Sequence, residues 1–170
     1  MVTSCLYFFE VKVTGKSIII EKELDPTLPP VMLDRQQMKQ VLLNLFLNAM
    51  DAMANRPGRL AVKTHRLTKP SGEAWVQVEV ADTGNGISPA DLEHIFDPFY
   101  TTKHESGERE GTGLGLTIVH QIIQEHHGYI EVESTLGRGT TFYVNLRTNP
   151  LDSGTPKEHR EHEKTGSVGR

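Results

Sequence analysis

The run Gln-Val-Leu-Leu-Asn-Leu-Phe-Leu-Asn-Ala-Met-Asp-Ala at residues 40–52 constrains the fold more than any other stretch. An α-helix has about 3.6 residues per turn, so residues three and four apart lie on one face. Asn44, Asn48 and Asp51 have this spacing and would form a polar stripe on an otherwise apolar helix. Asp34 is a suitable N-cap. The pattern predicts a largely buried helix over residues 35–55.

The polar stripe has two interpretations. Two amides and a carboxylate are unfavourable inside so apolar a helix unless something binds them. A hydrated Mg²⁺ ion would suit them, because side-chain amide oxygens are hard ligands. The alternative is a solvated helix edge, and a single short motif does not separate the two.

Composition limits the class of protein. A chain of 170 residues is long enough for one domain with a full core, and its formal charge of −4 gives no reason to expect nucleic-acid binding. Cys5 is the only cysteine, which excludes an internal disulfide and fits a reducing compartment. No apolar run approaches the roughly 20 residues of a membrane span. We expect a cytoplasmic location, although a parent protein could be membrane-anchored.

Periodicity and turn residues divide the chain into three parts. Residues 1–15 form an N-terminal segment, either helix or strand, that could continue from an upstream region; residues 16–147 form the main domain; and the polar residues 148–170 are expected to be a disordered tail. Within the main domain we expect strands at 16–24, 59–67, 74–81, 129–134 and 140–146, and helices at 35–55, 88–92 and 114–127. Gly128 is expected to end the last helix as its left-handed residue.

The sequence Asp82-Thr83-Gly84-Asn85-Gly86 directly follows an alternating strand. A carboxylate at a strand end can accept a hydrogen bond from an exocyclic amine. Glycines would allow the backbone to approach a flat ligand closely, because they have no Cβ. An ordinary turn capped by the aspartate is the alternative interpretation.

A second glycine-rich stretch, Gly111-Thr112-Gly113-Leu114-Gly115-Leu116, opens the last helix. Free N–H groups and the positive end of the helix dipole make such a terminus a natural phosphate site. The preceding loop is aromatic and ends in Lys103. The spacing differs from the dinucleotide-binding fingerprint, and a polar loop precedes it where that fingerprint has a strand.

Taken in order, these motifs resemble the ATP-binding catalytic domain of sensor histidine kinases, over about residues 16–147. That domain belongs to a superfamily shared with DNA gyrase, the heat-shock chaperone ATPase and the mismatch-repair ATPase. The loop at residues 96–103 most resembles the nitrogen-regulation subfamily. The resemblance implies an α+β fold (the Bergerat ATP-binding fold), a two-layer sandwich whose mixed, mostly antiparallel sheet has three helices on one face.

The resemblance also implies roles for individual residues. Asn48 matches the Mg²⁺ ligand that bridges to the phosphates of ATP, and Asn44 matches a second polar contact near them. Asp82 matches the acceptor of the adenine amino group, assisted through water by Thr140, and residues 97–112 match a mobile lid. Asn44, Asn48 and Lys103 are the implied catalytic residues. The other implied nucleotide contacts are Asp51, Gly84, Gly86, Ile87, Lys103, Gly111, Thr112, Gly113, Leu114, Gly115 and Leu116.

Two departures bear on the activity, one from other branches of the superfamily and one from the complete kinases. The chaperone and gyrase branches carry a glutamate general base where this chain has Asn44, and an amide cannot take a proton at neutral pH. All eight histidines lie at or after His65, so none occupies a phosphoacceptor helix hairpin preceding the ATP-binding part. We therefore expect the chain to bind Mg-ATP and phosphorylate a histidine on a separate dimerisation domain, which would serve a response regulator.

As this fragment alone, the chain is expected to be inactive in autophosphorylation. Three alternatives are a standalone ATPase or chaperone-like module, a serine protein kinase of the anti-sigma-factor type, and a nucleotide sensor without catalysis. Asn44 disfavours the ATPase, whereas the intact Asp82, Asn48 and glycine motif disfavour the passive sensor.

Overall fold

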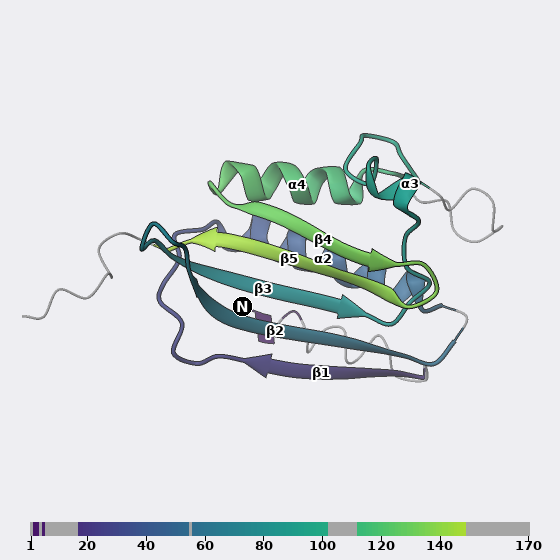
Figure 1. The fold of residues 1–170 in the computed structure, drawn as a ribbon, viewed down its shortest axis with the longest axis horizontal. Coiled ribbons are helices and arrows are strands. Elements are labelled where there is room, and N and C mark those ends of the chain that lie inside the picture. Colours follow the sequence, from purple (N-terminus) through teal and green to yellow (C-terminus); the bar gives the residue numbers. More distant parts are fainter. Residues whose placement is uncertain (1, 4, 6–16, 55, 102–111, 149–170) are drawn as a thin grey trace, which may run out of the picture.

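A five-stranded sheet forms the frame of the computed structural model, which describes residues 2–3, 5, 17–54, 56–101 and 112–148. Its strand order is β1-β2-β3-β5-β4 (Figure 1). Among the described strands only the β1–β2 pair is parallel, so the prediction of a mixed, mostly antiparallel sheet is confirmed. The strands are β1 (Ile18–Leu24), β2 (Gly58–Thr68), β3 (Ala74–Asp82), β4 (Tyr129–Thr135) and β5 (Gly139–Arg147).

Helices α2 (Arg35–Ala52) and α4 (Gly115–Glu125) contact each other, and α2 lies behind the sheet in Figure 1. The short helix α3 (Pro89–Leu92) follows β3. The core lies between α2, α4 and one face of the sheet, and includes the fully buried side chains of Val41, Phe46, Val62 and Ile123. Burying each such side chain contributes roughly 1.5–3 kcal/mol, so this apolar face holds the two layers together.

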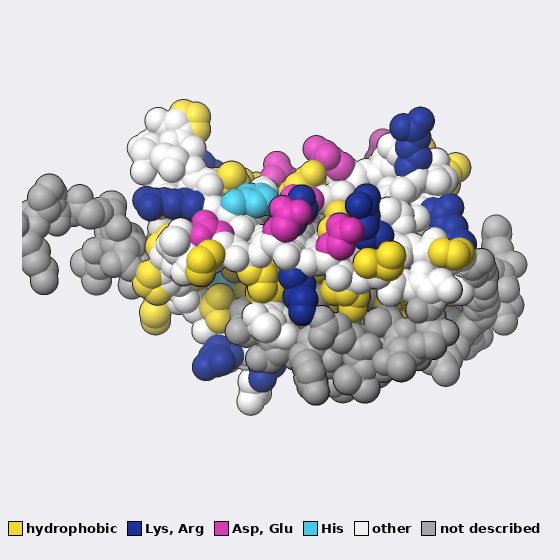
Figure 2. Space-filling model, turned by 90° about the horizontal axis from the view of Figure 1, so that it is seen from below, with side chains coloured by type: hydrophobic (Ala, Val, Ile, Leu, Met, Phe, Trp, Pro, Cys, Tyr) yellow, Lys and Arg dark blue, Asp and Glu magenta, His cyan; other side chains and the backbone are white. Residues whose placement is uncertain are grey.

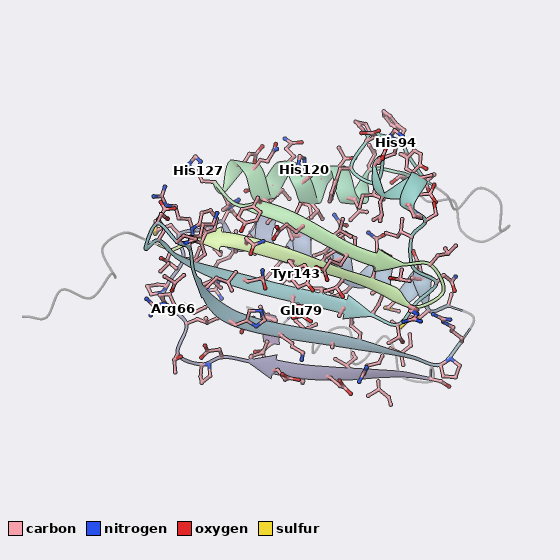
Figure 3. All side chains as sticks on the ribbon, in the orientation of Figure 1. Arg66, Glu79, His94, His120, His127 and Tyr143 are labelled. Carbon is pink, nitrogen blue, oxygen red and sulfur yellow. The ribbon has the colours of Figure 1, made fainter. Side chains whose placement is uncertain are left out.

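The other face of the sheet is polar, as strand alternation requires. Glu79 and Tyr143 lie on it and face the viewer in Figure 3. Acidic and basic side chains also alternate along the β1 edge (Figure 2), where Lys63 pairs with Glu23 at 3.1 Å. Charged side chains on an edge strand discourage pairing with another sheet.

The ends of the helices follow from local sequence. Asp34 caps α2, its Oδ1 accepting hydrogen bonds from the N–H groups of Gln36 at 2.7 Å and Gln37 at 3.0 Å, as predicted. Ser88 caps α3, with Pro89 in its first turn. Helix α2 ends at Ala52, three residues before the expected position, and the chain turns towards β2.

The prediction that Gly128 is the left-handed residue after α4 is wrong by one position. His127 has φ 55°, and the N–H groups of His127 and Gly128 donate to the carbonyls of Gln124 and Ile123, both at 2.9 Å. This is the Schellman pattern, with Gly128 in its second position. A Cβ on Gly128 would lie 2.4 Å from the Asn145 carbonyl oxygen, so close packing against β5 explains the glycine.

Most of the N-terminal segment and the tail beyond Thr148 lie outside the described residues, so the predicted disorder of the tail stays a prediction. Val2, Thr3 and Cys5 are helical, and Val2 and Cys5 pack against the core. Of the helices in the described ranges, none is long and apolar enough to cross a membrane.

Candidate functional site

Asp82, the last residue of β3, stands directly opposite Thr140 of β5 in the antiparallel register. Both side chains lie on the face of the sheet that the helices cover, at one end of the inner strands β3 and β5. Thr140 is buried and Asp82 is half-buried. The Asp82 Oδ1 accepts a hydrogen bond from the Gly84 N–H at 2.7 Å. The Thr140 hydroxyl lies 3.0 Å from the Ser134 Oγ, which donates to the Gly139 carbonyl at 3.0 Å.

The electrostatic environment of Asp82 combines two opposing influences. Burial raises the pKa of its carboxyl group above the usual value. Hydrogen bonds from the Gly84 and Thr140 N–H groups, and the positive charge of Arg56, act in the opposite direction. The result is a poorly hydrated acceptor, which is well suited to an exocyclic amine donor.

The loop after Asp82 is tied to two other parts of the chain. The Asn85 N–H donates to the Ala52 carbonyl at the end of α2, at 3.0 Å. The Gly137 N–H donates to the Asn85 carbonyl at 2.6 Å, and the Ile87 N–H donates to the Ser134 Oγ at 2.8 Å. The structure therefore brings Asp82, Gly84, Gly86 and Ile87 beside the end of α2 and the β4–β5 turn.

The two glycines of this loop are explained by packing within the chain. A Cβ on Gly84 would lie 2.5 Å from the Ala52 Cβ and 2.7 Å from the Asp82 Oδ1. Gly86 has φ 69°, and a Cβ there would lie 2.1 Å from the Thr135 carbonyl oxygen. The missing Cβ atoms thus make room for α2 and the β4–β5 turn, whereas the sequence suggested room for a ligand.

The polar stripe of α2 also lies as predicted, away from the buried positions of the helix. Asn44 and Asn48 are half-buried and Asp51 is exposed. The Asn44 Nδ2 donates to the Gly115 carbonyl at 3.2 Å, which connects the stripe to the start of α4. Asn48 lies one turn further along the same face of α2.

Helix α4 begins at Gly115, with Leu114 in the N-cap position and no side-chain cap among the described residues. The Leu114 N–H donates to the Thr112 Oγ1 at 3.4 Å, whereas the N-cap residue, a leucine, offers no acceptor to the N–H groups that follow it. Gly113 has φ 66°, and its carbonyl accepts from the Phe99 N–H at 3.0 Å, which joins the aromatic loop to the glycine stretch. Thr112, Leu114 and Leu116 are placed here, whereas Lys103 and Gly111 lie outside the described residues.

Sequence reasoning missed Ser134 and Arg56. Ser134 joins Ile87 to Thr140, and only the β4–β5 pairing reveals this connection. The Arg56 Nη2 donates to the carbonyls of Thr83 and Gly84, although its position in a turn after α2 carries no such signal.

The donor set suits a magnesium ion that is shared with phosphates. Across the described ranges, no group of three or more His, Cys, Asp or Glu side chains could hold a metal by itself. Mg²⁺ typically keeps several waters and takes only one or two protein ligands beside substrate phosphates. The half-buried Asn48 amide, one turn from the Asn44–Gly115 contact, fits that arrangement.

Comparisons with known proteins agree with this geometry. The family model described as "Histidine kinase-, DNA gyrase B-, and HSP90-like ATPase" matches residues 33–150. The chain is 43% identical over 147 residues to the sensory histidine kinase/phosphatase NtrB of Rhodobacter capsulatus, an alignment covering 81% of this chain and 39% of that protein. It is 39% identical over 135 residues to the sensor histidine kinase ZraS of Escherichia coli K12, covering 79% and 27%.

Among solved structures, the chain is similar to the nucleotide-free catalytic domain of histidine kinase ThkA, with a TM-score of 0.72 and 33% identity over 88% of this chain and 92% of that one. The chain therefore spans nearly all of a solved catalytic domain but well under half of the curated relatives above.

Proposed function

The chain belongs to the family of histidine kinase-, DNA gyrase B- and HSP90-like ATPases, as a histidine kinase ATP-binding catalytic domain, and on this premise we propose how it works. It binds Mg-ATP and donates the γ-phosphoryl group to a histidine on a separate dimerisation domain of the parent kinase, from which a response regulator is phosphorylated. The catalytic domain, at about residues 16–147 of this chain, lies in the cytoplasm, and the parent kinase is of the nitrogen-regulation type.

The observation that carries the proposal is the hydrogen bond from the Asn44 amide to the Gly115 carbonyl, which joins two distant motifs. Asp82 accepts from the adenine amino group at one end of the site, with Thr140 assisting through water. Asn48 offers its amide oxygen to Mg²⁺, which would neutralise charge on the phosphates when bound. The remaining nucleotide contacts proposed are Asp51, Gly84, Gly86, Ile87, Lys103, Gly111, Thr112, Gly113, Leu114, Gly115 and Leu116.

The same hydrogen bond favours transfer over hydrolysis. A general base must accept a proton, whereas the Asn44 side chain is an amide whose nitrogen already donates to Gly115. Water is therefore poorly activated, and an imidazole nitrogen from another domain is the better nucleophile. That nitrogen attacks the γ-phosphorus of ATP, the bond to the β,γ-bridging oxygen breaks, and ADP leaves. The contribution of this chain is to position ATP and stabilise the developing charge.

The test is a transfer assay with radiolabelled ATP. The chain alone should gain no acid-labile phosphate and should release phosphate slowly. Mixed with the histidine-bearing helix-hairpin domain of its parent kinase, it should label that domain, and linking the two pieces should speed labelling by raising their effective concentration.

Three other results would contradict the proposal. Brisk phosphate release by the chain alone would establish an ATPase. Acid-stable label on a partner's serine would establish a serine kinase. Nucleotide binding without transfer to the parent's own phosphoacceptor domain would leave a nucleotide sensor.

A further inference from the structure

We propose that Arg56 is a positioning residue for adenine recognition. Its guanidinium holds two peptide units of the loop after Asp82: one orients the Asp82 carboxylate, and the other fastens this loop to α2. This inference rests on the proposed role of Asp82 as the acceptor of the adenine amino group. Arg56 itself is not expected to touch the nucleotide.

The first of the two peptide units joins Thr83 to Gly84. Arg56 donates through Nη2 to its carbonyl, the Thr83 oxygen. The N–H of the same unit belongs to Gly84 and donates to the Asp82 Oδ1 at 2.7 Å. A trans peptide unit is planar, with its C=O and N–H pointing in opposite directions. Holding the carbonyl therefore fixes the direction in which the N–H meets the carboxylate.

The second unit joins Gly84 to Asn85 and is held in the same way. Arg56 donates to the Gly84 carbonyl, and the N–H of this unit, that of Asn85, donates to the Ala52 carbonyl at 3.0 Å. A single guanidinium nitrogen, Nη2, thus donates to two consecutive carbonyls, which its two N–H bonds allow. One side chain orients both N–H groups of the loop.

The position of Arg56 in the chain gives this contact a wider effect. Arg56 lies in the turn directly after α2, and its own N–H donates to the Met53 carbonyl at 3.4 Å. Helix α2 carries Asn44 and Asn48, the proposed phosphate and metal contacts. The guanidinium therefore ties the adenine side of the site to the helix that serves the phosphate side.

The charge of Arg56 acts in the same direction as its hydrogen bonds. Burial raises the pKa of Asp82, and the positive charge of Arg56 opposes that rise. Hydrogen bonds connected in series polarise one another, so the contact with the Thr83 carbonyl also strengthens the Gly84 N–H as a donor. Both effects favour the ionised carboxylate that accepts from an amine.

The experiment measures the affinity of the full chain for two nucleotides by calorimetric titration. One is ADP, and the other is purine riboside 5′-diphosphate, which lacks the 6-amino group. The wild-type chain should prefer ADP. Arg56→Ala should reduce that preference by roughly tenfold, equivalent to one good hydrogen bond, while affinity for the analogue changes little. Arg56→Lys should recover only part of the preference, because the lysine side chain is one bond shorter and its ammonium would not reach both carbonyls with the same geometry.

Arg59→Ala is the matched control. Its exposed guanidinium lies 3.5 Å from Glu21 on β1. The Arg59 backbone bonds to Thr83 at 3.1 and 2.9 Å, and alanine keeps both of these bonds, so the preference for ADP should be unchanged. Equal losses of both nucleotides in Arg56→Ala, or an unchanged preference, would overturn the inference. If Arg56→Ala does not fold, Arg56→Lys carries the same comparison. A wild-type chain that does not distinguish the two nucleotides would refute the proposed role of Asp82, and the inference with it.

Discussion

Asp82→Asn should separate nucleotide affinity from fold stability. Asparagine has nearly the same shape and keeps one oxygen for the Gly84 N–H, now 2.7 Å from the Asp82 Oδ1. Its other terminal group becomes an NH₂ donor facing the adenine amino group, so an acceptor is replaced by a second donor. A hydrogen bond to a charged group contributes about 1.5–3 kcal/mol, so ADP affinity should fall by roughly 10- to 150-fold.

The same substitution should stabilise the nucleotide-free chain at neutral pH. Burial raises the pKa of Asp82 in the folded state above its unfolded value. The native state therefore binds the proton more tightly, and the stability that this provides is present below the unfolded pKa and lost as pH rises through the folded pKa. An uncharged asparagine avoids that loss, so the melting temperature of Asp82→Asn should exceed that of the wild type above the folded pKa.

Calorimetric titration with ADP tests the expected loss of affinity, and thermal unfolding between about pH 4 and 8 tests the expected gain in stability. Glu79→Gln is the control, because Glu79 lies on the same strand but on the opposite face of the sheet. Unchanged ADP affinity in Asp82→Asn would show that adenine is bound elsewhere. A lower melting temperature at neutral pH would show that the charged carboxylate stabilises the fold.

Three further predictions concern other parts of the site and fold. Asn48→Ala should weaken ADP binding in the presence of Mg²⁺ and change metal-free binding little, because the amide oxygen is the proposed metal ligand. Equal losses of affinity with and without Mg²⁺ would instead assign Asn48 a structural role. Gly86→Ala should lower the free energy of urea unfolding by about 1–2 kcal/mol for its left-handed backbone, and by a further amount for the clash of the new Cβ with Thr135. Gly72→Ala is the control: its φ is 83°, but a Cβ there would meet no described atom within 4 Å, so only the backbone effect should appear. Asp34→Ala should lower the melting temperature at pH 7, because it removes the cap of α2. Hydrogen bonds from Gln37 and Gln36 lower the pKa of Asp34 in the folded state. The difference in melting temperature between wild type and variant should therefore be full above the unfolded pKa and disappear as pH falls through the folded pKa.

Residue periodicity determined the elements of this fold and much of their order. The i, i+3 and i+4 spacing placed Asn44, Asn48 and Asp51 on one face of α2, and alternation placed Val76, Val78 and Val80 on the buried face of β3. The cap at Asp34 was also predictable from the sequence, because it depends on N–H groups only two and three residues away. Resemblance of several motifs in series, rather than any one of them, indicated the family.

Contacts between distant segments were decided only by the tertiary structure. The sequence predicted the left-handed residue after α4 at Gly128, because glycine is favoured in that conformation. In the structure His127 has the positive φ, and Gly128 is required because a Cβ there would clash with Asn145 of β5. Likewise, Gly84 is required by Ala52, and Gly86 by Thr135. Arg56 reaches the Thr83 and Gly84 carbonyls across 27 and 28 residues of sequence. Such contacts depend on how strands pair and helices pack, which no local pattern encodes.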